Sequence, residues 1–450
     1  MELSGKKVLV LGLARSGAAV ARLLHRHGAQ VVVNDQKPLS ELGQEATDLQ
    51  ALGIEVIGGG HPEGIVHSGL DLVVKNPGIP YTAAPVAQAL ALGLPVYVEV
   101  ELAYRFAKAP IIGITGSNGK TTTTTLVGRM LDRAGLHPVV AGNIGHALTN
   151  VAEETPADHW LVAELSSFQM LGIEQFRPKV GALLNLYAAH LDYHGSMEEY
   201  RKAKVRLFQN QTEEDVAVLN WDQEMVREVA RTTKARVFPF SATQVLEEGV
   251  FVKDGVIQAI MHGNSISLLP VADVKLKGQH NMENVLAAAA IALSAGAAPE
   301  AIAEAARTFE GVEHRTEYVR TIDGVDFYND SKATNAEAAS RAIGGFAGNV
   351  VLIAGGLDRG TTFPELVPVF DKSVKHLVAI GQAADKLLAV AAQAGVPAQK
   401  ADTLEQAVQA AAEAATAGDV VLLSPACASW DMFGSFEERG SMFKKAVHTL

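Results

Sequence analysis

The stretch of sequence that decides the fold is Gly113-Ile114-Thr115-Gly116-Ser117-Asn118-Gly119-Lys120-Thr121. It lies between the apolar run Ile111–Ile114, which predicts a buried strand, and a helical pattern from about Lys120 to Ala134. A glycine-rich loop between a strand and a helix is typical of a phosphate-binding loop, because its backbone N–H groups and the helix N-terminus attract anions. We therefore expect Lys120 to reach the β- and γ-phosphates of a nucleotide and Thr121 to bind Mg²⁺.

This loop is a variant of the strict phosphate-loop motif. Glycine is usual where Ile114 stands, and the glycines of this loop are at 113, 116 and 119. A glycine-rich turn with a purely structural role is the alternative interpretation.

The pattern around the loop extends along the whole chain, because short β-branched runs alternate with amphipathic stretches. This alternation predicts an α/β fold. Changes of pattern near residues 107 and 311 predict three domains: a Rossmann-like domain at 1–107, a central ATPase-like domain with a mostly parallel sheet at 108–311, and a second Rossmann-like domain at 312–450. Short alternating runs divided by Asp254-Gly255 predict a small antiparallel insert over 236–276.

The individual elements follow from the same periodicities. Strands are expected at 8–11, 31–33, 55–57, 71–74, 96–98, 111–114, 160–163, 180–186, 216–219, 325–328, 350–354, 377–380 and 420–424. Helices are expected at 18–27, 120–134, 281–294, 364–372, 383–394 and 403–417.

Composition excludes several classes of protein. The 450 residues are 48% hydrophobic and 20% charged, as in a globular protein, and the net charge of −12 argues against nucleic-acid polymers and anionic membranes as partners. A single cysteine, Cys427, excludes an internal disulfide and a cysteine-based metal site. The N-terminus shows no secretory pattern and no apolar run is long enough for a bilayer, so we expect a cytoplasmic protein without membrane insertion.

Two strand ends near the predicted phosphate loop carry titratable side chains. The apolar run 160–163 ends at Glu164, where an acidic residue that assists a metal ion belongs, although a helix-capping role is the alternative. The run 180–186 leads into a segment with His190, Asp192 and His194. We expect either a metal or substrate role for His190 or a structural histidine.

The N-terminal turn Gly12-Leu13-Ala14-Arg15-Ser16-Gly17, with Asp35 after the next strand, is similar to a dinucleotide-binding fingerprint. Ala14 replaces the glycine that normally lets a pyrophosphate approach the backbone. Three interpretations stay open: a dinucleotide site for NAD, a site for the phosphates of another nucleotide, and a structural turn.

Two polar segments follow strands late in the chain. Asn329–Asn335 follows the run 325–328, and Ser424–Asp431 follows the run that begins at Val420. Open α/β sheets bind ligands at the carboxyl ends of their strands, so both segments are candidate sites. Loops satisfied by their own Asx and Ser turns are the alternative.

Taken together, these segments resemble the Mur ligase family of peptidoglycan synthesis over the whole chain. The loop Thr115–Thr121 matches the family's ATP loop. Four further segments are typical of the branch that adds D-glutamate, namely Gly142–Gly145, Glu164–Gln169, Asn329–Asn335 and Ser424–Ser429.

The resemblance implies a role for each matching residue. The implied catalytic residues are Lys120, Glu164, His190 and Lys204, and the implied metal ligands are Thr121, Glu164, His190 and Lys204. The implied ATP-binding residues are Gly116, Ser117, Asn118, Gly119, Lys120, Thr121, Thr122, Asn143, Asn281, Asn284, Arg315 and Asp330. The implied UDP-sugar-binding residues are Arg15, Ser16, Asp35, Gln36, Lys37, Asn76, Gly78, Asn143, Ser166 and Gln169. The implied D-glutamate-binding residues are Lys332, Thr334, Arg359, Ser429, Trp430 and Phe436.

The resemblance also implies an activity, which is the ATP-dependent ligation of D-glutamate to UDP-N-acetylmuramoyl-L-alanine through an acyl phosphate. It implies ATP, two Mg²⁺ ions with Mn²⁺ as an alternative, CO₂ that carbamylates Lys204, and a monomer. His190 or Asp192 is the expected general base, and the C-terminal domain is expected to close by a hinge near Gly311.

Four positions depart from the family pattern, and three competing functions stay open. Ala189, Tyr193, Arg359 and Trp430 stand where Asp, Arg, Lys and Leu are usual. The alternatives are another amide ligase of the superfamily (a sister Mur ligase or a folylpolyglutamate synthetase), a nicotinamide dehydrogenase, and an ATP-driven switch without catalysis.

Overall fold

The computed structural model describes residues 1–187, 190–276, 279–346 and 348–450, with the side chains of 192, 279 and 280 left aside. Ala189, one of the four departures from the family pattern, lies outside the described residues. The chain forms two compact units, Met1–Phe309 and Glu310–Leu450. The predicted domain boundaries near 107 and 311 stay predictions.

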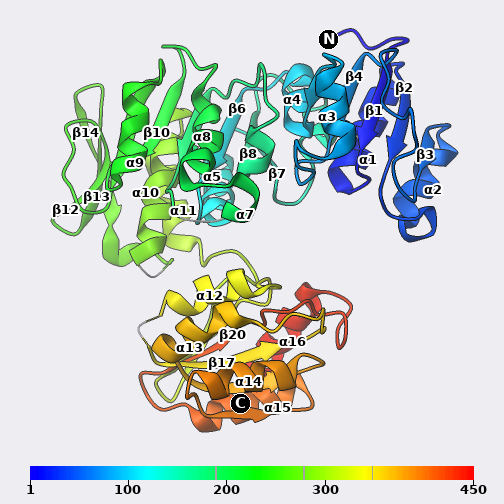
Figure 1. Ribbon diagram of the computed structural model, residues 1–450. Coiled ribbons are helices and arrows are strands. Elements are labelled where there is room, and N and C mark those ends of the chain that lie inside the picture. Colours follow the sequence, from blue (N-terminus) through cyan, green and yellow to red (C-terminus); the bar gives the residue numbers. More distant parts are fainter. Residues whose placement is uncertain (188–189, 277–278, 347) are drawn as a thin grey trace. The chain divides into compact units, whose positions relative to one another are not determined.

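The first sheet of unit 1 has five parallel strands in the order β3-β2-β1-β4-β5 (Figure 1). Its strands are β1 (Lys7–Leu11), β2 (Gln30–Asn34), β3 (Glu55–Ile57), β4 (Leu72–Lys75) and β5 (Val96–Tyr97). Its helices are α1 (Arg15–Arg26), α2 (Gly43–Ala51), α3 (Ala84–Ala91) and α4 (Glu99–Phe106). Val8 and Val10 face one apolar cluster and Leu9 and Leu11 another, so the sheet is buried on both faces as the apolar runs predicted.

The second sheet of unit 1 has nine strands in the order β14-β13-β12-β11-β10-β9-β6-β8-β7. Its parallel strands are β6 (Ile111–Thr115), β7 (Pro138–Gly142), β8 (Trp160–Glu164), β9 (Val180–Leu183), β10 (Val216–Asn220) and β11 (Arg236–Ser241). Its helices are α5 (Lys120–Arg133), α6 (Ser167–Met170), α7 (Leu191–His194), α8 (Met197–Val205), α9 (Glu224–Arg227), α10 (Gln279–Ser294) and α11 (Pro299–Thr308).

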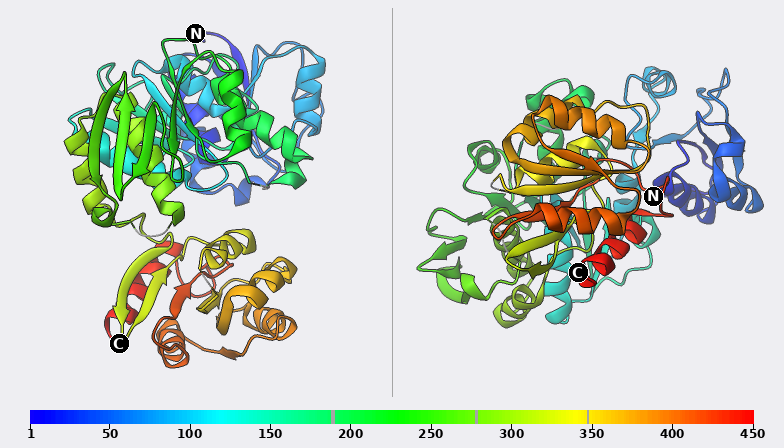
Figure 2. Two further views of the ribbon diagram at one scale, coloured as in Figure 1. Left: turned by 90° about the vertical axis from the view of Figure 1, so that its left-hand side faces the viewer. Right: turned by 90° about the horizontal axis from the view of Figure 1, so that it is seen from below.

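The predicted antiparallel insert is correct only in its second part. β11 pairs in parallel with β10, because it belongs to the main sheet, and β12 (Gly249–Lys253) pairs in parallel with β11. Only β12, β13 (Val256–Met261) and β14 (Asn264–Pro270) form an antiparallel meander, and they extend the same sheet, as the green strands in the left view of Figure 2 show. The β12–β13 turn has positive φ at both Asp254 and Gly255, which is typical of a two-residue hairpin.

Unit 2 has six strands in the order β15-β16-β20-β17-β18-β19, of which only β15 is antiparallel to its neighbour. The strands are β15 (Glu317–Ile322), β16 (Val325–Asn329), β17 (Val350–Gly355), β18 (Val374–Ile380), β19 (Ala398–Lys400) and β20 (Val420–Leu423). The helices are α12 (Ala336–Gly344), α13 (Val367–Ser373), α14 (Ala384–Gln393), α15 (Leu404–Ala414) and α16 (Phe436–His448). Leu352 faces the cluster with α12–α14 and Val351 the cluster with α15 and α16, so helices cover both faces.

Helix α4 connects the two sheets of unit 1 through buried carboxylates. The Glu101 side chain accepts backbone N–H groups of Glu174 (2.8 Å), Gln175 (3.1 Å) and Phe176 (3.0 Å) and pairs with Arg105 (2.8 Å). Two residues earlier, Glu99 Oε1 accepts the N–H of Thr149 at 2.6 Å, while its Oε2 has no hydrogen-bond partner among the described residues.

Burial of the Glu99 carboxyl raises its pKa above the ordinary value. The folded state therefore binds this proton more tightly than the unfolded state, and above the ordinary pKa the free energy of unfolding falls as pH rises. We expect Glu99→Gln to remove this slope and to raise the free energy of unfolding at neutral pH, because the neutral amide carries no charge to bury. Urea unfolding at about pH 5 and pH 8 measures it, and a variant with the wild-type slope would contradict it. Glu101→Gln should instead lose about 2 kcal/mol.

Candidate functional site

The glycine loop joins β6 to α5 as predicted, and its geometry explains the glycines. Gly119 has φ +79°, and a Cβ there would lie 2.1 Å from Asn284 Oδ1 on α10. Lys120 Nζ donates to the carbonyl oxygens of Gly116 (2.9 Å) and Ser117 (3.0 Å), so the lysine lies over its own loop. The lysine charge and the helix N-terminus would both stabilise an anion that bound at this loop.

A buried carboxylate lies beside the first turn of α5. Glu164, at the end of β8, is 3% exposed and accepts the Thr121 hydroxyl at 2.8 Å and the Asn143 amide at 2.9 Å. The alternative role of Glu164 as a helix cap is wrong, because Ser166 caps α6 in a capping box with Gln169. That box also occupies two residues predicted at the UDP-sugar site.

Lys204 lies directly under the loop. It is 1% exposed on α8, and its Nζ donates to Gly116 O at 2.8 Å and Thr115 Oγ1 at 3.4 Å. Nζ also lies 4.8 Å from the centre of the Tyr200 ring, whose hydroxyl is 3.1 Å from Ser117 Oγ. Lys204 is therefore a buried lysine in contact with the loop and not a solvated helix lysine.

His190 is the N-cap residue of the short helix α7 and has a left-handed conformation, with φ +55°. Its ring lies 5.0 Å from the Phe168 ring and 6.4 Å from the Tyr200 ring, which places it among the residues that follow β8 and β9. Strand β9 ends at Leu183, earlier than predicted, because residues from Leu184 on bind the loop: Asn185 Oδ1 accepts Asn118 N at 2.8 Å. Asn185 was not among the residues predicted from the sequence.

The other predicted nucleotide residues of unit 1 lie at the same loop. Asn284 Nδ2 donates to Asn281 Oδ1 at 3.2 Å, and both residues are on α10 beside Gly119. Thr122 is half-buried in the first turn of α5. Among the residues with described side chains, no cluster of three or more His, Cys, Asp or Glu forms a ready-made metal site.

The N-terminal turn is held by Asp35. Its Oδ2 accepts the N–H of Leu13 at 2.6 Å and its Oδ1 that of Lys37 at 2.9 Å. Asn76 Nδ2 lies 3.3 Å from Ser16 Oγ, and Asn76 Oδ1 accepts the N–H of Gly78 at 3.1 Å. The remaining predicted residues of this group, Arg15, Gln36 and Lys37, are exposed beside them.

In unit 2 the predicted residues gather on loops at the carboxyl ends of β16, β17 and β20. Asp330 is 5% exposed and accepts Ser424 Oγ at 2.9 Å and Thr316 N at 3.0 Å, and burial raises its pKa to about 6. Lys332 Nζ lies 5.4 Å from the Phe436 ring. Arg315 and Arg359 are exposed, Thr334 is half-buried and Ser429 is buried.

One buried cation under these loops was missed in the sequence, where it is an ordinary helix residue. Arg439, on α16, is fully buried and donates to Ser331 Oγ (3.0 Å), Ser331 O (2.8 Å) and Cys427 O (3.1 Å). It therefore links the loops after β16 and β20. Separately, Arg359 lies 5.1 Å from the centre of the Trp430 ring, so two departures from the family pattern contact each other.

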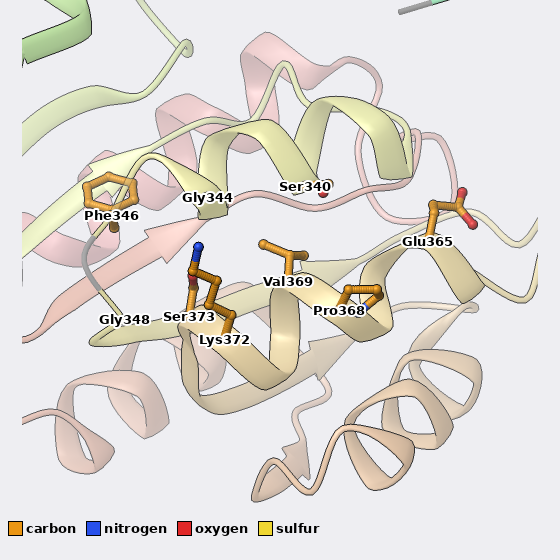
Figure 3. Close-up of a pocket in the computed structure, with 9 residues that line it drawn as sticks. All are labelled: Ser340, Gly344, Phe346, Gly348, Glu365, Pro368, Val369, Lys372 and Ser373. Atoms are coloured by element: carbon orange, nitrogen blue, oxygen red, sulfur yellow. The ribbon is translucent and has the colours of Figure 1, made fainter. Parts of the chain in front are cut away.

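A recessed surface of unit 2 lies apart from these loops. It lies between α12 and α13 and is lined by residues such as Ser340, Phe346, Glu365 and Lys372 (Figure 3). None of its nine lining residues is a predicted site residue. No helix of the described ranges has both the length and the apolar character that a bilayer crossing requires.

The geometry of unit 1 defines the class of protein. A strand, a glycine loop with Lys120 and Thr121 at the start of a helix, and a buried acid at the end of the neighbouring strand are the parts of a phosphate-loop nucleotide-binding enzyme. Comparisons with known proteins identify the family. Residues 6–98 match the "Mur ligase MurD-like, N-terminal domain", 114–292 the "Mur ligase middle domain" and 314–427 the "Mur ligase, glutamate ligase domain".

Curated relatives match over nearly the whole chain. The UDP-N-acetylmuramoylalanine--D-glutamate ligase of Geobacillus kaustophilus (strain HTA426) is 54% identical over 99% of this chain and 98% of its own length. The protein of the same name from Bacillus cereus (strain G9842) is 49% identical over 100% of this chain and 99% of its own. The chain belongs to the Mur ligase family, and the predicted family and ligase class are confirmed.

Solved structures confirm the predicted fold class. A pseudomurein peptide ligase type C from Methanothermus fervidus aligns with a TM-score of 0.57 at 17% identity, over 99% of this chain and 100% of that one. The UDP-N-acetylmuramate-alanine ligase MurC of Thermotoga maritima aligns with a TM-score of 0.55 at 18% identity, over 98% of this chain and 99% of that one. The three-domain α/β architecture is therefore that of the family.

Proposed function

We propose that this protein uses ATP to join D-glutamate to UDP-N-acetylmuramoyl-L-alanine, releasing ADP and phosphate. The observation that carries the proposal is the phosphate loop, with Lys120 over its carbonyl groups and Glu164 on Thr121. The two substrates are those in the name of the relatives that are about half identical to this chain over its full length. Of the competing functions, a dehydrogenase receives no support from Ala14 in the N-terminal turn.

The residues of the loop would bind the triphosphate. Lys120 exchanges its two carbonyl partners for β- and γ-phosphate oxygens, and the N–H groups at the start of α5 donate to the same oxygens. Asn143, already held by Glu164, lies at the end of β7 where it can donate to a reacting oxygen. Asn281 and Asn284 would contact the nucleotide from α10.

The residues present fit the Mg²⁺ that this family of reactions implies. Thr121 Oγ1 and Glu164 Oε2 are hard oxygen donors, buried and 2.8 Å apart, which suits Mg²⁺ bound mainly through phosphate oxygens. His190 and a modified Lys204 would complete the set. Bound there, Mg²⁺ would neutralise charge on the phosphates, since two unit charges 4 Å apart repel by about 4 kcal/mol at an effective dielectric of 20.

Lys204 would serve as an oxygen ligand after carbamylation. Its uncharged amine forms an N–C bond to CO₂ and loses one proton, which leaves an anionic carbamate in place of an ammonium. The chemical reason is charge, because a buried ammonium beside the loop repels a metal ion and a carbamate attracts one. The near-complete burial of Lys204 beside Gly116 supports this proposal.

The ligation has two steps. The L-alanine carboxylate attacks the γ-phosphorus and ADP leaves; the D-glutamate amine then attacks the acyl carbon, loses a proton and expels phosphate. Two residues are candidates for the base that takes this proton. The structure describes the side chain of His190 but not that of Asp192. Lys332, Arg359 and Ser429 would bind the D-glutamate carboxylates from unit 2. The predicted closure near Gly311, the monomeric state and the cytoplasmic location stay predictions.

The test measures ADP release with UDP-N-acetylmuramoyl-L-alanine and, one at a time, D-glutamate, L-glutamate, D-alanine and a diamino acid. We expect release that depends on D-glutamate and on the sugar nucleotide together. Release with a diamino acid or L-glutamate instead would favour a sister ligase or a folylpolyglutamate synthetase. ADP release that needs no amino acid would favour the ATP-driven switch.

A further inference from the structure

Strand β4 ends in a buried cation to which the proposed function gives no role. Lys75 is 1% exposed, and its Nζ lies 2.8 Å from Ile79 O, 3.3 Å from Pro77 O and 3.5 Å from Asn76 O. An ammonium has three donors, and here three carbonyl groups of one turn surround it. Nζ also lies 4.5 Å from the centre of the Tyr81 ring.

The charge of Lys75 is not compensated by a carboxylate within the described part of the chain, where its contacts are carbonyl oxygens and one aromatic ring. Burial accordingly lowers the pKa of Lys75 to about 8. A desolvated cation of this kind costs stability relative to an apolar side chain of similar shape. Its presence is therefore better explained by what it holds than by the stability of the fold.

A second donor reaches the same turn from the other sheet of unit 1. The Tyr193 hydroxyl, on α7, lies 3.4 Å from Pro77 O and 3.3 Å from Ile79 O, two of the three carbonyl groups that bind Lys75. The Tyr193 ring packs edge-on against Phe168 at 4.7 Å. His190 is the N-cap residue of α7, so the turn 76–79 is tied to the residues beside the phosphate loop.

On its other side, the turn 76–79 packs against the N-terminal glycine turn. A Cβ at Gly12 would lie 2.9 Å from Asn76 Cβ and 3.2 Å from Ile79 Cδ1, so the two turns touch. Asn76 also contacts Ser16 across this boundary. The position of the turn 76–79 therefore sets the shape of the surface that carries the predicted UDP-sugar residues.

We propose that Lys75 and Tyr193 are positioning residues for the sugar nucleotide, because their donors share the carbonyl groups of the turn 76–79 and fix it between the Gly12 turn and α7. This inference rests on the proposed function, since it assumes that the sugar nucleotide binds at the Gly12 turn. It also gives Tyr193, a departure from the family pattern, a specific task. Neither residue touches a reacting atom in this scheme.

The test compares Lys75→Met, Tyr193→Phe and the double variant in steady-state ADP release. We expect KM for UDP-N-acetylmuramoyl-L-alanine to rise about 10-fold for Lys75→Met and about 3-fold for Tyr193→Phe, with KM for ATP and kcat within about 2-fold. The double variant should fall short of the product of the two effects, because the donors share acceptors. Lys75→Met should melt no lower than the wild type.

The matched controls are Lys6→Met, an exposed lysine paired with Asp71 beside the same sheet, and Tyr104→Phe on α4. Both should leave every KM within about 2-fold. Variants at 75 and 193 that behave like these controls, or that raise KM for all three substrates equally, would overturn the inference while the wild type stays active. A wild type without D-glutamate-dependent ADP release would overturn the proposed function instead, and calorimetric binding of the sugar nucleotide to the same variants would still test the positioning role.

Discussion

Replacing Lys120 with alanine is expected to abolish measurable D-glutamate-dependent ADP release, with a fall in kcat of about 1,000-fold or more. The physical reason is that Lys120 Nζ lies on the carbonyl groups of Gly116 and Ser117 in the loop that is proposed to bind the triphosphate. A positive charge placed where negative charge develops on the transferred phosphoryl group lowers the barrier most in a site that excludes water. Loss of one such donor typically lowers kcat by about 100- to 1,000-fold. We expect the loss of a charged donor to be at the upper end of this range.

The measurement is coupled ADP release at saturating substrates, with ATP binding followed separately by calorimetry. Thr125→Ala is the matched control, because its hydroxyl donates to Thr121 O at 2.8 Å one turn further along α5 and lies outside the predicted site. We expect this control to keep its rate within about 2-fold. A Lys120→Ala enzyme that still releases ADP in response to D-glutamate would remove Lys120 from the mechanism and the ligase proposal with it.

The elements that could be predicted from the sequence are those whose signals are local. The strands around Leu9 and Leu352 are continuous apolar runs, and the glycine loop carries its own signature between β6 and α5. Strand β11 was assigned to the wrong part of the sheet, because β11 and the meander that follows have the same alternating pattern. Pairing direction is a long-range property that a period of two does not encode.

The same distinction applies to the site. Lys120, Thr121 and Glu164 were predicted from their positions at a loop and a strand end, and in the structure the Thr121 hydroxyl donates to Glu164. Lys75 and Arg439 were missed, because their importance comes from burial beneath turns, which their neighbours in sequence do not indicate. The nearest available signal for Lys75 was its place between an apolar run and Asn76-Pro77-Gly78, where a charged residue at the end of a buried strand is uncommon.

The second large effect is expected for Lys204→Ala, which should lower kcat by about 100- to 1,000-fold. In the proposed scheme the alanine variant loses an anionic ligand, and removal of a group that stabilises charge in the reacting complex costs a rate of this order. Lys202→Ala is the matched control, because Lys202 is on the same helix, exposed, and paired with Glu199 at 2.8 Å. It should keep the wild-type rate, since an exposed helix pair contributes little.

A rate loss alone would not separate carbamylation from a structural role, because Lys204 also donates to Gly116 O at 2.8 Å. Three further readouts separate the two roles. Wild-type protein in carbon-13 bicarbonate should show a carbamate resonance that is absent from Lys204→Ala and retained in Lys202→Ala, and removal of CO₂ should slow the wild type but not the alanine variant. Lys204→Ala should also recover part of its rate when a small carboxylate is supplied, because an added anion can occupy the space that the side chain leaves. A wild type without the carbamate signal and insensitive to CO₂ would restrict Lys204 to holding the phosphate loop.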